Sequence, residues 1–513
     1  MELVTVGVIA PGPRRLILPL FKEKRARLPS LGHVLRRMVD RALEEKAFQK
    51  EVAETFFLLP PGPREISSLL LLGLGQERKC TLETLRRAFG SLARRLHREL
   101  PKEKRGKFFL CLDSPTVTSR LSSLGWESVA QAITVGWILG SYSYDVYKTS
   151  PGDRKKPAPL VLFLSPRKRG GDGLLPEMEA AVRAGVKKGQ ILGEAVHFAR
   201  DLSNAPANEV YPEVLAARAK ALAKRCGLSV QILHERDLAR ARMGALLGVA
   251  QGSDKPPCLI VLKYEPKTKA KRTIALVGKA ITFDSGGLSI KPAKGMEEMK
   301  FDMAGGAAVM GALMAISRLK PPFRVLGILP ATENVIGGSA MRPGDILRSA
   351  SGKTIEVINT DAEGRLILAD ALHFAQRFRP DYTVDFATLT GACLIALGTQ
   401  ISGLVGNDKA FTRKVFEAGE RSGERLWELP LYDEFVDQIK STVADLKNST
   451  GRNAGTITAA AFLSRFVGQK PWCHVDIAGT AWAEKESGCF LAGATGVGVR
   501  LVVELLEGLE GKE

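Results

Sequence analysis

The sequence predicts an α/β fold with two domains, a smaller N-terminal α/β domain and a larger C-terminal domain with a mainly parallel central sheet flanked by helices. Its 513 residues, of which 45% are hydrophobic, suffice for more than one buried core. Short apolar runs alternate with amphipathic runs along the chain, as in parallel α/β sheets. A basic, glycine-rich loop at 167–173 separates the two parts, so we predict domains at 1–170 and 205–513, connected by a loop and helix at 171–204.

The N-terminal domain is predicted to alternate strands with helices. Apolar runs predict strands at 3–10, 65–75, 107–113 and 158–166. Apolar residues at helical spacing predict helices at 31–45, 81–100 and 126–144. Such alternation indicates an α/β domain.

The C-terminal part begins with a long helical pattern at 176–204 and a polar loop. Further helices are predicted at 214–227, 304–319 and 496–509, and another in the apolar run that follows Glu363. Strands are predicted at 228–235, 258–266, 271–284, 324–334, 353–361, 382–392 and 471–479. Sites in open α/β sheets lie beyond the carboxyl ends of strands, so polar residues at those ends are the candidates for function.

The net charge of +19 is concentrated in the first third of the chain. Residues 1–180 hold 31 Lys and Arg against 19 Asp and Glu, which gives +12 and leaves +7 for the other 333 residues. A basic surface binds nucleic acid through phosphates, or simply keeps a protein soluble. No helix-turn-helix, zinc-finger or aromatic RNA-binding pattern accompanies the charge, and both alternatives stay open at this point.

Cysteine use and hydropathy predict a cytoplasmic protein without a membrane anchor. The seven cysteines are scattered without a C-x-x-C pair, as expected for reduced thiols. The longest apolar runs, such as ISSLLLLGLG, are too short to span a bilayer. The N-terminal MELVTVGVIA has no basic region before its apolar residues, so it predicts a strand and not a signal peptide.

The stretch NTDAEGRLILAD at 359–370 is the first candidate for a functional site. Asp361, Glu363 and Arg365 alternate, so in an extended chain their side chains share one face. Two acids this close are costly unless a cation neutralises them. The alternative is a solvated turn with acids at the N-terminus of a helix.

Two further acids follow apolar segments upstream. Asp284 ends a predicted strand five residues after Lys279, so the two share a face only if the strand breaks near 278–280. Asp302 lies just before a predicted helix, and no histidine lies among the four carboxylates. An oxygen-rich site without histidine or thiolate suits Mg, Mn or Zn. Four acids are enough for a pair of ions about 3.5–4 Å apart.

At these residues the chain resembles the leucyl (cytosol) aminopeptidase family of two-metal exopeptidases. The matching stretches, in order, are VGKAITFDSGGLSIKP, EEMKFDMAGGAAV, PATEN, RPGDI, NTDAEGRL, DFATLTGA and DIAGTAW. The strong similarity covers roughly residues 190–500, whereas the first 140 residues match mainly in their α/β pattern. The resemblance implies a macro-like N-terminal domain and a C-terminal catalytic domain.

The resemblance implies a metal-dependent aminopeptidase that releases N-terminal residues, Leu-like ones preferred, by attack of a metal-activated water. The implied ligands of one ion are Asp284, Asp361 and Glu363, and those of the other are Lys279, Asp284, Asp302 and Glu363. An amine binds a metal only when neutral, and a neighbouring dication depresses its pKa. The alternative for Lys279 is an ordinary salt bridge. The ions implied are Mn or Zn, with Mg or Co as further alternatives.

Two basic residues are catalytic by the same resemblance. Lys291 would stabilise the oxyanion that the attack produces. Arg365 would hold a bicarbonate ion that relays the proton, with backbone contacts from Gly364 and Leu389. The planar fork of arginine suits such an anion. The alternative is that both are solvated basic residues that balance the acids.

The free amine of the substrate would bind one metal near Asp302, and its first side chain would enter a pocket. The implied lining of that pocket is Met299, Thr388, Gly391, Ala478 and Ala481, and Asn359 would orient the peptide beyond the scissile bond. Plain core packing is the alternative for these residues. The sequence departs from the family at Ala492, where lysine is frequent, and this bears on substrate preference and not on the reaction.

The family also implies a cytoplasmic homohexamer, a dimer of trimers, that degrades peptides with a free N-terminus. A hypothesis of another class is a nucleic-acid-binding scaffold that acts through the basic N-terminal domain, with or without peptidase activity. Its motivation is the charge of +12 on residues 1–180.

Overall fold

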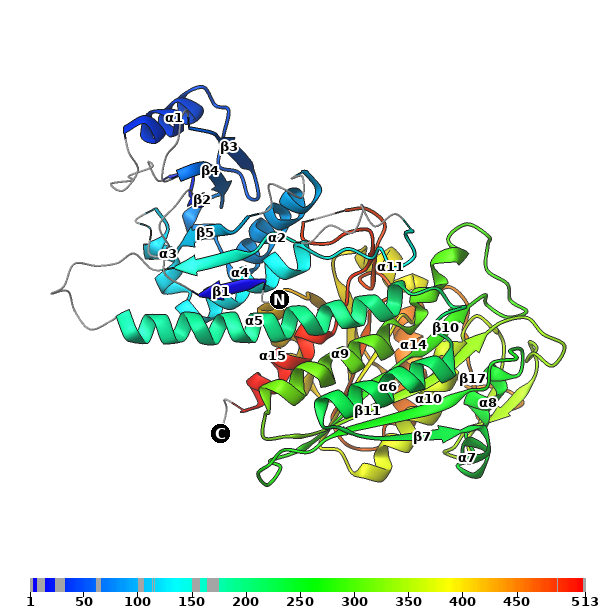
Figure 1. Cartoon of the computed structure of the whole chain (residues 1–513). Helices are drawn as coiled ribbons and strands as arrows, with labels where there is room; N and C mark the ends of the chain where they lie inside the picture. Colours follow the sequence, from blue (N-terminus) through cyan, green and yellow to red (C-terminus); the bar gives the residue numbers. More distant parts are fainter. Residues whose placement is uncertain are drawn as a thin grey trace. The chain divides into compact units, whose positions relative to one another are not determined.

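The structure is a computed structural model of the chain, and it describes residues 3–6, 14–23, 33–60, 66–99, 106–112, 114, 116–149, 157–163, 175–486 and 488–510. The chain divides into two compact units (Figure 1). The N-terminal unit is Met1–Glu194 with Lys485–Ala492, and the C-terminal unit is Ala195–Glu484 with Gly493–Glu513. The predicted helix at 176–204 is α5 (Leu175–Asn204), which contributes to both units, whereas the predicted loop at 167–173 lies outside the described residues.

The N-terminal unit is built on a six-stranded sheet. Its strands, in spatial order, are β1 (Val4–Val6), β6 (Leu160–Phe163), β5 (Phe108–Cys111), β2 (Arg14–Leu20), β4 (Ile66–Gly73) and β3 (Thr55–Leu58). Neighbouring strands are parallel except β3 and β4. The helical segments are α1 (His33–Glu44), η1 (Glu77–Lys79), α2 (Leu82–Glu99), α3 (Thr118–Ser123) and α4 (Trp126–Gly140).

Strand β4 shows why a run of leucines forms a central strand. Leu70 and Leu72 belong to the core that also contains residues of α2 and α4, whereas Leu69 and Leu71 pack with α1. Successive side chains point to opposite faces, so a strand covered on both faces is apolar throughout. The neighbouring strand β2 is not among the predicted strands, although it carries Pro19 within the sheet.

The C-terminal unit is built on a nine-stranded sheet. Its strands, in spatial order, are β16 (Leu426–Glu428), β15 (Ser402–Gly406), β18 (Trp472–Asp476), β14 (Tyr382–Ala387), β9 (Thr273–Gly278), β11 (Arg324–Asn334), β8 (Cys258–Tyr264) and β7 (Ser229–His234), and β10 (Ala280–Asp284) pairs with the end of β11. Strands β18, β14, β9, β10 and β11 are parallel, and β15 and β8 run antiparallel to β18 and β11. The predicted mainly parallel central sheet is therefore confirmed, with antiparallel strands towards its edges.

Helices cover both faces of the central strands. On one face, Val309 and Leu313 of α9 (Ala304–Leu319) lie over Gly327 of β11. On the other face, α8 (Gly244–Ala250), α10 (Glu363–Ala375) and α14 (Gly455–Leu463) share a core with Val277 and Ile328. The start of α10 thus lies at the carboxyl ends of the central strands.

The remaining elements connect these layers. The other helices are α6 (Pro212–Cys226), α7 (Glu235–Arg240), α11 (Gly391–Leu397), α12 (Lys409–Ser422), α13 (Asp433–Gln438) and α15 (Val499–Glu510). Short 3-10 segments are η4 (Met296–Met303), η5 (Gln376–Phe378) and η6 (Ser464–Phe466). Two small sheets consist of β12 (Ile346–Arg348), β13 (Thr354–Glu356) and β17 (Leu446–Lys447), and of β19 (Trp482–Ala483) and β20 (Gly493–Ala494).

Two of the predicted strands lie near the candidate site, and the structure agrees with one prediction and contradicts part of the other. The predicted strand at 271–284 breaks at Lys279 into β9 and β10, as its spacing from Asp284 required. The predicted strand at 353–361 is wrong beyond Glu356, where β13 ends. Asp361 lies in a turn instead, because its backbone N–H donates to Asn359 Oδ1 at 2.8 Å.

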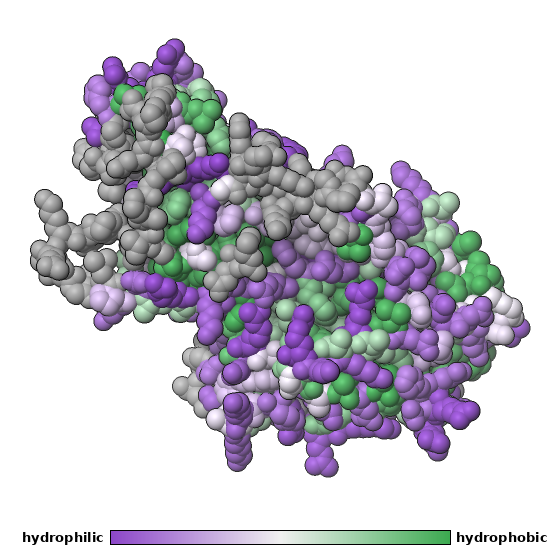
Figure 2. Space-filling model, viewed as in Figure 1, coloured by the Kyte–Doolittle hydropathy of each residue, from purple (hydrophilic) through white to green (hydrophobic). Residues whose placement is uncertain are grey.

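One segment among the described residues, Met296–Leu319, is long and apolar enough to cross a membrane, and 89% of its most apolar window is buried in the protein. Its composition is explained by the core position of α9. Figure 2 shows hydrophilic residues over much of the visible face, with hydrophobic patches between them. Exposed apolar side chains of the C-terminal unit include Ile395 (88% exposed), Tyr432 (63%) and Trp427 (58%).

Candidate metal centre

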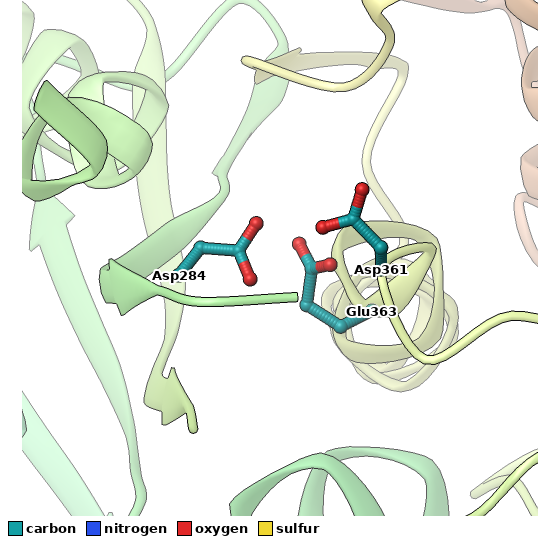
Figure 3. A group of neighbouring side chains, drawn as sticks. All are labelled: Asp284, Asp361 and Glu363. Carbon is teal, nitrogen blue, oxygen red and sulfur yellow. The ribbon is translucent and has the colours of Figure 1, made fainter. Parts of the chain in front are cut away.

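Three carboxylates from separate elements converge in the C-terminal unit. Asp284 ends β10, Asp361 lies in the turn before α10, and Glu363 is the first residue of α10. Figure 3 shows their carboxylates turned toward one another. One oxygen from each lies within 4.8 Å of the others, a spacing at which all three can hold a metal ion.

The shared face expected for Asp361, Glu363 and Arg365 is wrong, because the chain is not extended there. Glu363 and Arg365 are both in α10, where a two-residue step rotates a side chain by about 200°. The guanidinium of Arg365 is buried and donates from Nη1 to the backbone oxygen of Asn448 at 2.6 Å. Asp361 and Glu363 converge because the turn at 359–362 redirects the chain.

Lys279, between β9 and β10, and Asp302, in η4, complete the cluster. The Lys279 ammonium lies 2.8 Å from Asp302 Oδ2 and 2.8 Å from Glu363 Oε1, and it donates to the backbone oxygen of Thr388 at 3.0 Å. Burial lowers the pKa of Lys279, but the surrounding carboxylates outweigh it and raise the pKa above its ordinary value. In this arrangement Lys279 is a buried ion-pair partner of two acids.

Gly364 is required by the close approach of Lys279. A Cβ at Gly364 would lie 2.7 Å from Lys279 Nζ and 2.8 Å from its Cε, which is closer than real Cβ contacts. Only glycine therefore leaves room for the lysine beside the first turn of α10.

Lys291 lies on the solvent side of the cluster. Its ammonium is 2.7 Å from Asp284 Oδ2 and 2.5 Å from Asp361 Oδ1, and the side chain is 21% exposed. Burial lowers the pKa of Lys291, but Asp284, Glu363 and Asp361 outweigh it and raise the pKa. Lys291 therefore carries its positive charge at neutral pH.

The cluster has an excess of negative charge. Four carboxylates face two ammonium groups, which leaves 4 − 2 = 2 negative charges uncompensated when all are ionised. Burial first, and then the neighbouring acids, raise the pKa values of Asp302, Asp361 and Glu363. Asp302 Oδ2 and Asp361 Oδ1 are buried, and the polar group beside each is an ammonium, that of Lys279 for Asp302 and that of Lys291 for Asp361. Hard oxygen donors with this charge fit Mg, Mn or Zn.

The three residues predicted to bind bicarbonate are neighbours of the cluster in the sequence. Gly364 and Arg365 directly follow Glu363, and Leu389 directly follows Thr388. Burial lowers the pKa of Arg365 to about 10, so the guanidinium remains protonated at neutral pH, and its buried Nε has no hydrogen-bond partner. The N–H of Leu389 donates to Asp476 Oδ1 at 3.2 Å. The unpartnered Nε of Arg365 is thus a donor available to an anion.

The residues predicted to bind substrate have varied surroundings. The hydroxyl of Thr388 donates to Asp302 Oδ1 at 2.6 Å, which ties it to the acid cluster. Asn359 caps the turn at Asp361 through its side-chain oxygen. Met299 and Ala478 are half-buried, Gly391 is exposed, and Ala481 is 1% exposed. The structure therefore brings Thr388 and Asn359 to the cluster through hydrogen bonds, and the pocket remains a prediction.

Two asparagines to which the sequence alone assigns no role support the site. Asn448, which follows β17, accepts the backbone N–H of Ile358 at 2.8 Å and donates to the backbone oxygen of Asn359 at 2.7 Å. Its backbone oxygen accepts Arg365, so it holds both the turn and the arginine. Asn334 ends β11 and donates to Asp284. The only sequence signal for Asn334 was its place in PATEN.

A second buried polar group lies in the same sheet. His474 Nδ1 of β18 is 2.6 Å from Asp385 Oδ1 of β14, and Trp472 Nε1 donates to Asp385 Oδ2 at 2.7 Å. Burial lowers the pKa of His474, but Asp385 outweighs it and raises the pKa. Asp385 thus has donors for both its oxygens within the fold.

Residues 197–503 match the "Cytosol aminopeptidase family, catalytic domain", and residues 19–151 match its "N-terminal domain". The "Probable cytosol aminopeptidase" of Geobacter sulfurreducens is 45% identical over 480 residues, which are 94% of this chain and 93% of that protein. That of Gloeobacter violaceus is 41% identical over 97% of this chain and 98% of its own length. A solved structure, "Bottromycin maturation enzyme BotP in complex with Mn", has a TM-score of 0.82 at 33% identity and covers 97% of this chain and 100% of that one.

Proposed function

The chain belongs to the cytosol aminopeptidase family and is a metal-dependent aminopeptidase, which is a hydrolase. We propose that its acidic cluster is the catalytic centre and holds two divalent ions. The proposed ligands are Asp284, Asp361 and Glu363 for one ion, and Lys279, Asp284, Asp302 and Glu363 for the other. The observation that carries the proposal is the convergence of Asp284, Asp361 and Glu363 in one metal-sized group. When bound, the ions would acidify a water molecule and polarise the scissile carbonyl.

The chain's own residues supply the rest of the reaction. Lys291, positively charged and partly exposed beside Asp284 and Asp361, would stabilise the negative charge that develops on the carbonyl oxygen. Arg365 is held in place by Asn448 and has a free Nε, so it would bind bicarbonate together with the backbone of Gly364 and Leu389. Arg365 would thereby hold a base close to the water molecule that attacks the scissile bond.

Asp302 and its neighbours would select substrates with a free N-terminus. The free amine of the substrate would bind one ion, and the Asp302 carboxylate, held by the Thr388 hydroxyl, would help to hold that amine, which an internal peptide bond lacks. The proposed pocket for the first side chain is lined by Met299, Thr388, Gly391, Ala478 and Ala481, with Asn359 beyond the scissile bond. Their small or apolar character favours Leu-like residues.

The metal, the assembly and the location are part of the same proposal. The related bottromycin maturation enzyme, solved in complex with Mn, supports Mn for this oxygen-rich site, with Zn, Mg and Co as alternatives. A cytoplasmic homohexamer is proposed from the family, and the exposed Ile395, Trp427 and Tyr432 are available for contacts between subunits. The nucleic-acid hypothesis rests on the charge of the sequence alone.

Hydrolysis of leucyl-p-nitroanilide by the full chain tests this function. We expect activity that EDTA abolishes and Mn²⁺ restores, with about two Mn²⁺ bound per chain. N-acetyl-leucyl-p-nitroanilide is the matched control, and it should not be hydrolysed because it has no free amine. A chain that binds two ions and hydrolyses no aminoacyl-p-nitroanilide would contradict the proposal.

A further inference from the structure

Asn334 lies between the two carboxylates that are proposed to bridge the ions. It is the last residue of β11 and 2% exposed. Its side-chain nitrogen donates to Asp284 Oδ1 at 2.8 Å and lies 3.4 Å from Glu363 Oε2. The hydrogen bond to Asp284 is therefore the short one, and the contact with Glu363 is at the outer limit of hydrogen-bond distance.

The amide leaves one oxygen of each carboxylate for another partner. Asp284 Oδ2 is 2.7 Å from the Lys291 ammonium, and Glu363 Oε1 is 2.8 Å from that of Lys279. The oxygens that face Asn334 are therefore different from those that face the lysines. This division favours one rotation of each carboxylate plane, more strongly for Asp284 than for Glu363.

The position of Asn334 is itself fixed by the backbone on both sides of the cluster. Its backbone oxygen accepts Ser285 N at 2.8 Å and Ser285 Oγ at 3.0 Å, directly after Asp284. Its side-chain nitrogen also lies 3.1 Å from the backbone oxygen of Thr360, in the turn that precedes Glu363. Asn334 thus connects the two chain segments that carry the bridging acids.

A neutral donor suits this place better than a charged one. A lysine or arginine here would cancel the negative charge that attracts divalent ions, and an ionised aspartate would add repulsion without donating a hydrogen bond. An amide holds two anions in place and leaves their charge unchanged.

We propose that Asn334 is a positioning residue of the metal centre, which orients Asp284 and Glu363, the two acids that would hold both ions. The inference rests on the proposed two-metal site. Partners outside the ligand set typically contribute a factor of about 10 to 100 in metal affinity.

The test is Mn²⁺ binding by EDTA-treated full-length chain, measured as free Mn²⁺ by electron paramagnetic resonance. Asn334→Leu keeps the branched shape and removes the donor, and Asn334→Ala removes both. We expect the Kd for Mn²⁺ to rise about 10- to 100-fold in both variants, while the unfolding midpoint of the metal-free chain changes little. Activity should recover towards the wild-type kcat when Mn²⁺ is raised in proportion.

The matched control is Asn407→Ala. Asn407 also joins backbone groups within the C-terminal unit, through Trp472 N and the backbone oxygen of Lys470, and it touches no residue of the cluster through those bonds. Its Kd for Mn²⁺ should stay within about twofold of wild type.

Three outcomes would overturn the inference: wild-type affinity in folded Asn334→Leu, wild-type affinity in folded Asn334→Ala, or failure of both variants to fold, which would make Asn334 a residue of fold stability. A wild-type chain that binds no Mn²⁺ would instead refute the proposed function, so the two failures are distinguishable.

Discussion

The two units of the chain differ in what they bury. In the C-terminal unit seven acids are buried: Asp284, Asp302, Glu363, Asp370, Asp385, Glu424 and Asp476. Within the described part of the N-terminal unit no acid is buried, and its buried charged side chains are Arg86 and Arg94. Both units have extensive apolar cores, so size alone does not explain the difference. Burial of a carboxylate costs free energy, so the concentration of buried acids indicates that the functional site lies in the C-terminal unit.

The buried acids of the C-terminal unit fall into two classes. Asp385 is satisfied by Trp472 and His474, and Glu424 accepts the backbone N–H groups of Gly498 and Leu501 at the start of α15. The four acids of the cluster face only two ammonium groups and repel one another. Hydrogen bonds within the fold satisfy the carboxylates of the first class, whereas the negative charge of the second class requires a further cation.

The largest expected effect is on the second class. Glu363→Gln removes one charge from the acids that hold the ions, and we expect kcat/KM for leucyl-p-nitroanilide to fall about 1,000-fold, because metal stabilisation of several kcal/mol is lost. The control is Glu99→Gln in α2 of the N-terminal unit, a partly exposed acid paired with Arg95. Its kcat/KM should stay within about twofold, and retention of full activity by Glu363→Gln would contradict the proposed ligands.

A smaller effect, on stability, is expected for the first class. Asp385→Ala leaves the indole N–H of Trp472 unpaired and His474 without its counter-charge in a fully buried place. We expect the unfolding free energy to fall by about 3 kcal/mol, as for other broken buried pairs. Urea unfolding of the EDTA-treated chain measures it. Glu99→Ala should lower the unfolding free energy by less than about 1 kcal/mol, because its ion pair with Arg95 is exposed. Equal losses in the two variants would contradict the difference between the buried and the exposed acid.

The smallest effect concerns Asp370 and pH. This carboxylate accepts the backbone N–H groups of Leu246 at 2.9 Å and Ala350 at 2.6 Å, and burial raises its pKa to about 7 against their influence. Unfolded aspartate has a pKa of about 3.9, so between about pH 4 and 7 only the folded chain holds the proton. Stability therefore falls as pH rises through this window and is level above it.

Asp370→Asn removes this titration. Relative to wild type, the variant should gain about 2 kcal/mol in unfolding free energy between pH 5 and pH 7, as measured by urea midpoints of the EDTA-treated chain. Glu99→Gln should show no comparable gain with pH. An identical pH dependence in wild type and Asp370→Asn would show that Asp370 is ionised in the fold throughout.

The sequence by itself determined the fold class and most central elements. Apolar runs with alternating or helical period mark β4, β9, β11, α2 and α9, because burial on one or two faces leaves a local pattern. The break between β9 and β10 also followed from local spacing, since Lys279 and Asp284 share a side of the chain only if the strand is interrupted. The resemblance to a family named the candidate ligands, because those residues stand in ordered local motifs.

The tertiary structure alone decided how these residues are used. The chain turns at 359–362 instead of continuing β13, so Arg365 points to Asn448 and not along with Asp361. Gly364 makes room for Lys279, which is 85 residues away in the chain (364 − 279). Asn334 reaches two acids that local periodicity does not relate to it. Periodicity reports which face a residue occupies within its own element, whereas these contacts join separate elements, and only their packing brings the atoms together.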